Sequence, residues 1–238
     1  MRHCTSCFAL FAICSKRRDT TLNQRIASWL SKLRLHDSST YHHSIRVSNM
    51  ARRIAAELNL NQEQTQKLVL GCILHDIGKI FVPKSILGKS SVLTHNEWVL
   101  MKQHPIWGND FLRNEGITDQ DVTGAVLYHH ERPDGTGYPF GLAAGDIPFC
   151  ARICAILDAF DCMVSGRPYR KSITFADAKI ELWENRNKQF DPYVLTVFLQ
   201  MSESYFIELH HTMNSEYDRQ YLSQNDPPYL LSESAFLG

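Results

Sequence analysis

The chain has 238 residues, of which 44% are hydrophobic, and its 25 basic and 25 acidic residues give a formal net charge of zero. This length and apolar content support a packed core of one large or two small domains, which excludes a disordered chain. The balanced charge leaves no basic excess for general nucleic-acid binding, so we expect neither DNA nor RNA as a partner.

The cysteine pattern and the absence of a long apolar run bear on where the protein acts. The odd number of seven cysteines, most of them in apolar helical patterns, indicates reduced thiols and not a disulfide framework. No apolar run approaches the length that spans a bilayer. We therefore expect a cytoplasmic protein without a membrane span.

Helical periodicity dominates the N-terminal half, and alternating strand patterns are almost absent. The first predicted helix carries one apolar stripe that consists of Leu22, Ile26, Trp29, Leu30 and Leu33. The second has His43 on the same face as Val47, Met50, Ile54 and Leu58. Asn61, with Gln64 three residues later, is a predicted N-cap for a third helix, which runs to His75 and Asp76.

Further helices follow in the middle of the chain. Residues 94–97 form a capping-box pattern, and the helix that they open is predicted to end near His104, because Pro105 restricts the residue before it. A helix from Pro105 is expected to stop at Gly116. Another starts near Asp119 and reaches His129 and His130.

Residues 131–148 are the main interruption, since four glycines and three prolines are too many for a helix. Three helices are predicted after it, one following Pro148, one capped by Thr174 and one with Pro192 in its first turn. The sequence predicts an all-α chain without internal repeats. We expect a short N-terminal segment (1–20), one helical domain (21–213) and a C-terminal tail (214–238).

Several histidines and aspartates border apolar helix faces and are candidates for one metal site. They are His43, His75, Asp76, His104, His129, His130 and Asp158. Imidazole nitrogens and carboxylate oxygens suit iron, manganese or zinc, and two such metals suit phosphate-ester hydrolysis. Each residue alone is more often a satisfied core residue or an ion-pair partner. Burying all of them without a cation would cost several kcal/mol.

Two loops supply candidate substrate contacts. In the glycine-rich run after His130, Tyr138 is a candidate for stacking on a base, although the run is also typical of an ordinary surface turn. Arg167 and Arg170 flank a proline and could address phosphate or a guanine edge, or simply lie in a solvated loop. Lys79 either stabilises charge on a leaving oxygen or pairs with Asp161.

Seven runs, in order and with approximate spacing, make the chain resemble the HD-GYP domain family over residues 22–199. The runs are His43-Ser44-Ile45-Arg46-Val47, Leu74-His75-Asp76-Ile77-Gly78-Lys79, Lys102-Gln103-His104-Pro105, His129-His130-Glu131-Arg132, Asp134-Gly135-Thr136-Gly137-Tyr138-Pro139, Asp158-Ala159-Phe160-Asp161 and Arg167-Pro168-Tyr169-Arg170. Members of this branch of the HD metallohydrolases degrade the bacterial messenger cyclic di-GMP.

The resemblance implies a single all-α domain of about seven or more helices around a metal site. It implies a site of two or three divalent ions, iron or manganese, with the seven candidates above as ligands and Asp76 as the bridge. Substrate contacts would come from Lys79, Gly137, Tyr138, Pro139, Arg167 and Arg170. Asp161 would orient Lys79 or a group in the second coordination sphere.

The implied reaction is attack of a metal-activated hydroxide on a phosphorus of cyclic di-GMP, with Asp76 and Lys79 as catalytic residues. The product is linear pGpG, and a second round would give GMP. Ser39 stands where family members with three metals carry Glu, which favours two ions and pGpG. The changes after Asp161, from Cys162 to Gly166, remove no predicted ligand.

Two alternatives remain open. One is an interaction module that contacts GGDEF-domain or other signalling proteins. A lost ligand would favour this reading, and none is lost. The other is an HD phosphohydrolase acting on a different nucleotide, against which the Gly137-Tyr138-Pro139 loop argues. A homodimer is a candidate assembly for either.

Overall fold

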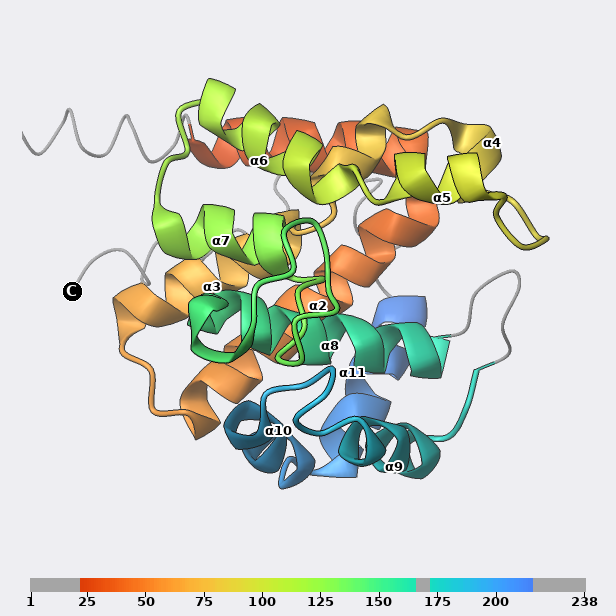
Figure 1. Ribbon diagram of the computed structural model, residues 1–238. Coiled ribbons are helices and arrows are strands. Elements are labelled where there is room, and N and C mark those ends of the chain that lie inside the picture. Colours follow the sequence, from red (N-terminus) through yellow and green to blue (C-terminus); the bar gives the residue numbers. More distant parts are fainter. Residues whose placement is uncertain (1–21, 166–171, 216–238) are drawn as a thin grey trace, which may run out of the picture.

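The computed structural model describes residues 22–165 and 172–215, and Figure 1 shows their arrangement. The predicted N-terminal segment (1–20) and residues 216–238 of the predicted tail lie outside this part of the chain, as do Arg167 and Arg170. Within the described ranges the regular structure is helical, apart from two isolated β-bridges. The prediction of an all-α fold is therefore confirmed.

A helix over residues 22–36 precedes the elements labelled in Figure 1. The α-helices that follow are α2 (Ser38–Glu57), α3 (Gln62–Leu74), α4 (Lys84–Leu87), α5 (His95–Met101), α6 (His104–Asn114), α7 (Gln120–Tyr128), α8 (Phe149–Ser165), α9 (Phe175–Glu184), α10 (Pro192–Leu199) and α11 (Glu203–Ser215). Two 3₁₀ turns lie at Ile77–Phe81 (η1) and Ala144–Asp146 (η2). None of the helices in the described ranges is both long and apolar enough to cross a membrane.

The helix starts lie where the capping residues predict them. Asn61 and Thr94 each form a complete capping box, with Gln64 and Glu97 returning the hydrogen bond. Asp119, Thr174 and Asp191 accept backbone N–H bonds at the starts of α7, α9 and α10. Gly116, with a φ of 82°, follows α6 as the expected left-handed residue.

Some helix ends differ from the prediction, since α5 stops at Met101 and α7 at Tyr128, before His129 and His130. The third helix stops at Leu74, and Asp76, at φ −100° and ψ 9°, has left the helical conformation. The 3₁₀ turn η1 follows and passes so close to α6 that a Cβ on Gly78 would lie 2.0 Å from the His104 carbonyl oxygen. This close packing ends α3 early and turns Asp76 toward the start of α6.

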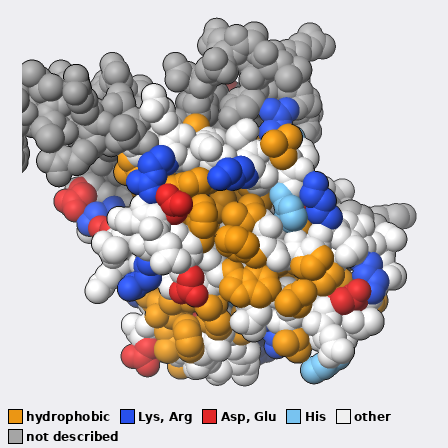
Figure 2. All heavy atoms as spheres, turned by 90° about the horizontal axis from the view of Figure 1, so that it is seen from above, with side chains coloured by type: hydrophobic (Ala, Val, Ile, Leu, Met, Phe, Trp, Pro, Cys, Tyr) orange, Lys and Arg blue, Asp and Glu red, His pale blue; other side chains and the backbone are white. Residues whose placement is uncertain are grey.

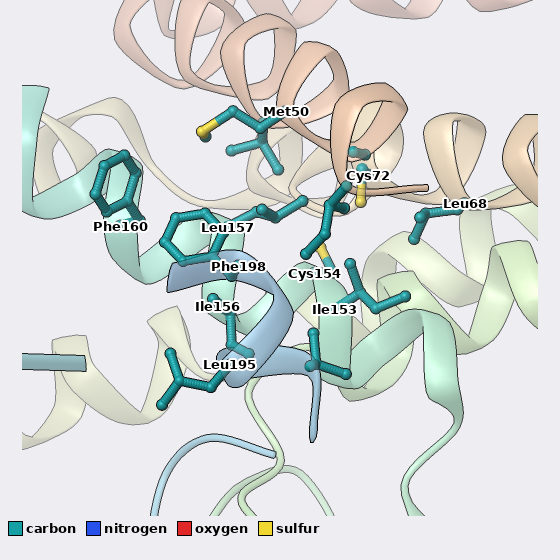
Figure 3. Packing of buried hydrophobic residues seen from close by; sticks show 14 of the residues in the cluster. Met50, Leu68, Cys72, Ile153, Cys154, Ile156, Leu157, Phe160, Leu195 and Phe198 are labelled. Atoms are coloured by element: carbon teal, nitrogen blue, oxygen red, sulfur yellow. The ribbon is translucent and has the colours of Figure 1, made fainter. Parts of the chain in front are cut away.

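Helix α8 runs through the middle of the molecule, between α2, α3 and α7 on one side and α9 and α10 on the other (Figure 1). Its apolar residues Ile153, Leu157 and Phe160 are fully buried. Figure 3 shows them packed with Met50, Leu68, Cys72, Leu195 and Phe198 from three other helices. Asp158 and Asp161 lie on the same helix, so the main core fixes their position.

A second core cluster joins the helix over residues 22–36 to α3 and α7. Trp29, Leu30 and Leu33 are buried in it, as the first apolar stripe predicts. Seen from above in Figure 2, apolar side chains also gather on the surface at the α4–α6 end of the molecule. Phe81, Trp98 and Val99 are among the large apolar residues that are exposed there.

The contact between η1 and α6 leads to a testable prediction. We expect Gly78→Ala to destabilise the protein by about 2 kcal/mol or more, because the new methyl group would overlap backbone atoms of His104 and Gly108. Urea unfolding measures this change. Gly145→Ala is the matched control, since nothing lies within 4 Å of its added Cβ, and we expect a change within about 0.5 kcal/mol. Equal stability of the two variants would contradict the packing argument.

Candidate metal centre and active site

Five segments bring the seven predicted ligands together. His43 comes from α2, His75 and Asp76 from the end of α3, and His104 from the first residue of α6. The two remaining histidines follow α7, and the last carboxylate is on α8: His129, His130 and Asp158. Five of the seven are buried, and His130 and Asp158 are half-buried.

Three of the histidines are oriented in the same way. The Nδ1 atoms of His75, His104 and His129 donate to the carbonyl oxygen three residues earlier, at 2.7, 2.8 and 2.9 Å. A neutral imidazole that carries its proton on Nδ1 has a lone pair on Nε2. Each of these Nε2 atoms is therefore available as a metal ligand, and the backbone fixes its direction.

The ligand atoms form two groups on the two oxygens of Asp76. Oδ2 lies 3.3 Å from His75 Nε2, whereas Oδ1 lies 3.2 Å from His104 Nε2. His43 Nε2 joins the first group, at 3.3 Å from His75 Nε2 and 3.1 Å from Asp158 Oδ1. His129 Nε2 joins the second, at 3.2 Å from His104 Nε2.

These distances define three overlapping sets of potential metal ligands. Within each set the ligand atoms lie within 4.8 Å of one another. The sets are His43 with His75 and Asp158, His75 with Asp76 and His129, and His104 with His129 and His130. The Asp76 carboxylate lies among these ligand atoms, which could hold divalent metal.

The electrostatics of the site also fit a cation. Burial opposes ionisation of Asp76, but Lys79 and the neighbouring histidines hold the pKa of its carboxyl well below the ordinary value. Burial lowers the pKa of His130 to about 3, with His104 adding to the effect, and lowers the pKa of His129 as well. The Asp76 carboxyl is thus ionised, and the His129 and His130 imidazoles are neutral, at neutral pH.

His43 behaves differently from the other histidines. Burial acts to lower the pKa of its imidazole, but hydrogen bonds to Asp158 and Asp161 outweigh burial and raise the pKa. A cation on Nε2 would displace the proton that these carboxylates stabilise.

One buried oxygen among the predicted ligands lacks a hydrogen bond. Asp76 Oδ1 is buried and has no donor, because the nearby His104 Nε2 carries no proton when Nδ1 donates to the Met101 carbonyl. Leaving a charged acceptor unsatisfied in the interior costs about 1–3 kcal/mol or more. The donor set and this oxygen together fit divalent metal ions, held by nitrogen and carboxylate ligands.

Asp161 and Arg46 support the His43 side of the site. Asp161 Oδ2 lies 2.7 Å from His43 Nδ1, and Arg46 donates two bonds to the carboxylate, at 2.7 and 2.8 Å. The pKa of Asp161 is lowered, since these hydrogen bonds outweigh burial. Arg46 was part of a quoted motif but had no predicted role, and only the fold reveals its contact 115 residues away.

Lys79 lies beside the predicted bridge. Its Nζ donates to Asp76 Oδ2 at 2.6 Å, and the side chain is only 7% exposed. The ion pair is with Asp76, so the suggested pairing with Asp161 is not the contact that the geometry favours. Lys79 also lines the groove at the site, within reach of a bound ligand.

The glycine-rich loop packs directly against the ligands. A Cβ on Gly137 would lie 2.5 Å from the backbone of Glu131, so only glycine fits there. The Tyr138 ring stacks on the His130 imidazole, with centroids 4.6 Å apart. Pro139 follows through a cis peptide bond. The ordinary surface turn is therefore excluded, and one partner of Tyr138 is His130.

Glu131 is a structural residue of this loop that the sequence did not reveal. Its side chain is 2% exposed and accepts the backbone N–H groups of Phe140 and Leu142, at 2.7 and 3.0 Å. These bonds close the loop around Tyr138. The only sequence signal was its place directly after the two histidines.

Two cavities reach the site. A groove of about 600 Å³ is lined by Lys79, His104, His130, Tyr138 and Asp158 on its polar side, and Ser39 is at its rim. A smaller cavity of about 340 Å³ lies beside the loop and also reaches His130 and Asp158. Both are large enough to accept part of a nucleotide.

Comparisons with known proteins agree with this geometry. A model of the HD domain family matches residues 27–194. A cyclic di-GMP phosphodiesterase of Pseudomonas aeruginosa, PA4108, is 39% identical over 72% of this chain and 41% of its own length. A cyclic di-GMP phosphodiesterase of Thermotoga maritima is 37% identical over 75% of this chain and 48% of its own length. The chain thus spans less than half the length of these relatives.

Other relatives extend the range of substrates in the group. A 3'3'-cGAMP-specific phosphodiesterase of Vibrio cholerae is 33% identical over 70% of this chain and 39% of its own length. Among solved structures, the HDGYP protein Bd1817 of Bdellovibrio bacteriovorus has a TM-score of 0.56 and 25% identity over 66% of this chain and 50% of that chain. The chain belongs to the HD domain family, in the HD-GYP group that its motifs indicate.

Proposed function

We propose that this chain is a metal-dependent phosphodiesterase that hydrolyses cyclic di-GMP to linear pGpG. The observation that carries the proposal is the position of Asp76, whose two carboxylate oxygens face two separate groups of ligand atoms. The curated relatives named as cyclic di-GMP phosphodiesterases support the substrate.

In this proposal two divalent ions, iron or manganese, are held by the seven histidine and aspartate side chains. When bound, they supply a Lewis acid and a nucleophilic water at neutral pH. The exposure of Ser39 at the groove, in place of a carboxylate, supports two ions and pGpG as the product. A cytoplasmic location remains a prediction, as do GGDEF-domain partners and a homodimer.

The chain's own residues bind and orient the substrate. Lys79, at the groove and 2.6 Å from Asp76, carries a positive charge toward the place where a scissile phosphate would lie. Tyr138 and the loop from Gly137 to Pro139 form the wall beside His130. Arg167 and Arg170, outside the described residues, are proposed to complete the phosphate contacts.

The central experiment measures bound metal and product together. Protein purified with iron and manganese supplied should contain about two metal ions per chain and convert cyclic di-GMP to pGpG, followed by chromatography. Asp76→Asn should lose metal and reduce turnover by about 100-fold or more, because one oxygen of the proposed bridge is replaced by an amide.

The matched control is Asp146→Asn, which makes the same chemical change at an exposed position in η2. It should retain metal and activity. If wild-type protein contained less than one metal ion per chain and formed no linear product, the proposed enzymatic function would be wrong. Normal hydrolysis by Asp76→Asn would contradict the assignment of Asp76 as the bridging metal ligand.

A second prediction concerns Asp161. Asp161→Asn should weaken metal binding by about 10–100-fold, because its amide nitrogen cannot accept a bond from Arg46 or His43. Competition with a chromogenic chelator measures the affinity, and circular dichroism checks that the variant is folded. An affinity equal to that of the Asp146→Asn control would show that Asp161 does not support the site.

A further inference from the structure

A second cavity lies beside the glycine-rich loop and next to the candidate metal ligands. We call it the Gln189 cavity, and its lining includes Lys102, Arg132, Gln189, Trp98 and Tyr138. It shares four residues with the larger groove: Trp98, His130, Tyr138 and Asp158. A ligand held at the metal site could thus extend into either cavity, with Tyr138 between them.

The two cavities differ in chemistry. The wall of the groove away from the ligands is apolar and consists of Ile86, Leu87, Val92, Leu93 and Met101. The Gln189 cavity instead presents three side chains that carry N–H donors, Lys102, Arg132 and Gln189. The Gln189 cavity thus offers a group of N–H donors that could bind the polar edge of a base.

Hydrogen bonds fix how these donors are presented. Arg132 donates to both carboxylate oxygens of Asp134, at 3.2 and 2.9 Å, and to Gln189 Oε1 at 3.2 Å. Because Arg132 occupies the amide oxygen of Gln189, the donor end of this amide is the end left for a ligand. The Lys102 ammonium lies 5.9 Å from the centre of the Tyr138 ring, on the same side of the loop as the cavity.

Aromatic rings complete the cavity. Trp98 and Tyr138 lie with their centroids 6.4 Å apart and their planes at 73°. Trp98 is about half exposed, which leaves a face open to a planar group. A cavity of about 340 Å³ has room for one purine.

We propose that the Gln189 cavity binds one guanine of the dinucleotide and selects guanine over adenine. Guanine carries two acceptors, O6 and N7, on one edge, whereas adenine carries an amino donor in place of O6. The N–H donors of Lys102, Arg132 and Gln189 would pair with the first and oppose the second. The proposal rests on the proposed function for the position of the phosphate, but it concerns recognition of the base.

Equilibrium binding of mononucleotides tests the cavity without any hydrolysis step. Isothermal titration calorimetry of the manganese-loaded protein measures its affinities for GMP and for AMP. Because the two ligands share the phosphate and the ribose, the ratio of the affinities reports the contribution of the base. We expect wild-type protein to prefer GMP by about tenfold or more.

Gln189→Glu is the variant that tests the amide donor most directly. The carboxylate still accepts the bond from Arg132 but replaces the amide donors by an acceptor, so the preference for GMP should fall by about tenfold or more. Gln120→Glu is the matched control, because it adds the same charge at an exposed position outside the cavity and should keep the wild-type ratio.

Lys102→Met provides a second variant if the first folds poorly. It removes one donor and keeps the length of the side chain, so it should reduce the preference for GMP severalfold. Equal binding of GMP and AMP by wild-type protein, or an unchanged ratio in both variants, would overturn the proposal. Loss of cyclic di-GMP hydrolysis with the preference intact would instead count against the proposed function alone.

Discussion

The structure depends on a cluster of imidazole lone pairs that face one carboxylate in the interior. His104 and His129 direct the lone pairs of their Nε2 atoms at each other across 3.2 Å, because each Nδ1 donates to a backbone carbonyl oxygen. Facing lone pairs repel unless a positive charge lies between them, and Asp76 adds a buried oxygen without a donor. The remaining features of the site can be understood as means of holding these atoms in place.

Backbone and side chains share that task. Backbone carbonyl groups near helix ends orient three of the histidines, so no additional side chain is needed to accept their Nδ1 protons. Asp161 and Arg46 orient His43. The glycine-rich loop covers His130 through Tyr138, and Glu131 secures the loop. The positions of the histidines and of the glycine-rich loop thus depend on one set of contacts.

The sequence predicted the helices and the faces on which the ligands lie, because capping residues and apolar spacing are local signals. His43 follows this rule with Val47 and Met50 on α2. What spacing could not provide is the pairing of side chains across helices, such as Arg46 with Asp161, because it depends on how the helices pack. The early end of α3 was also missed, since it follows from contact with α6.

The distance along the chain between interacting groups has a consequence for folding. His43 contacts Asp161 across 118 residues, and α2 must meet α8 before either can hold the other. Contacts between such remote segments pay the entropy of closing a long loop before they contribute stability. The cluster of candidate metal ligands is therefore expected to form late in folding, when the helices have packed together. A fragment that lacks either helix would lose the contacts between His43, Asp158 and Asp161.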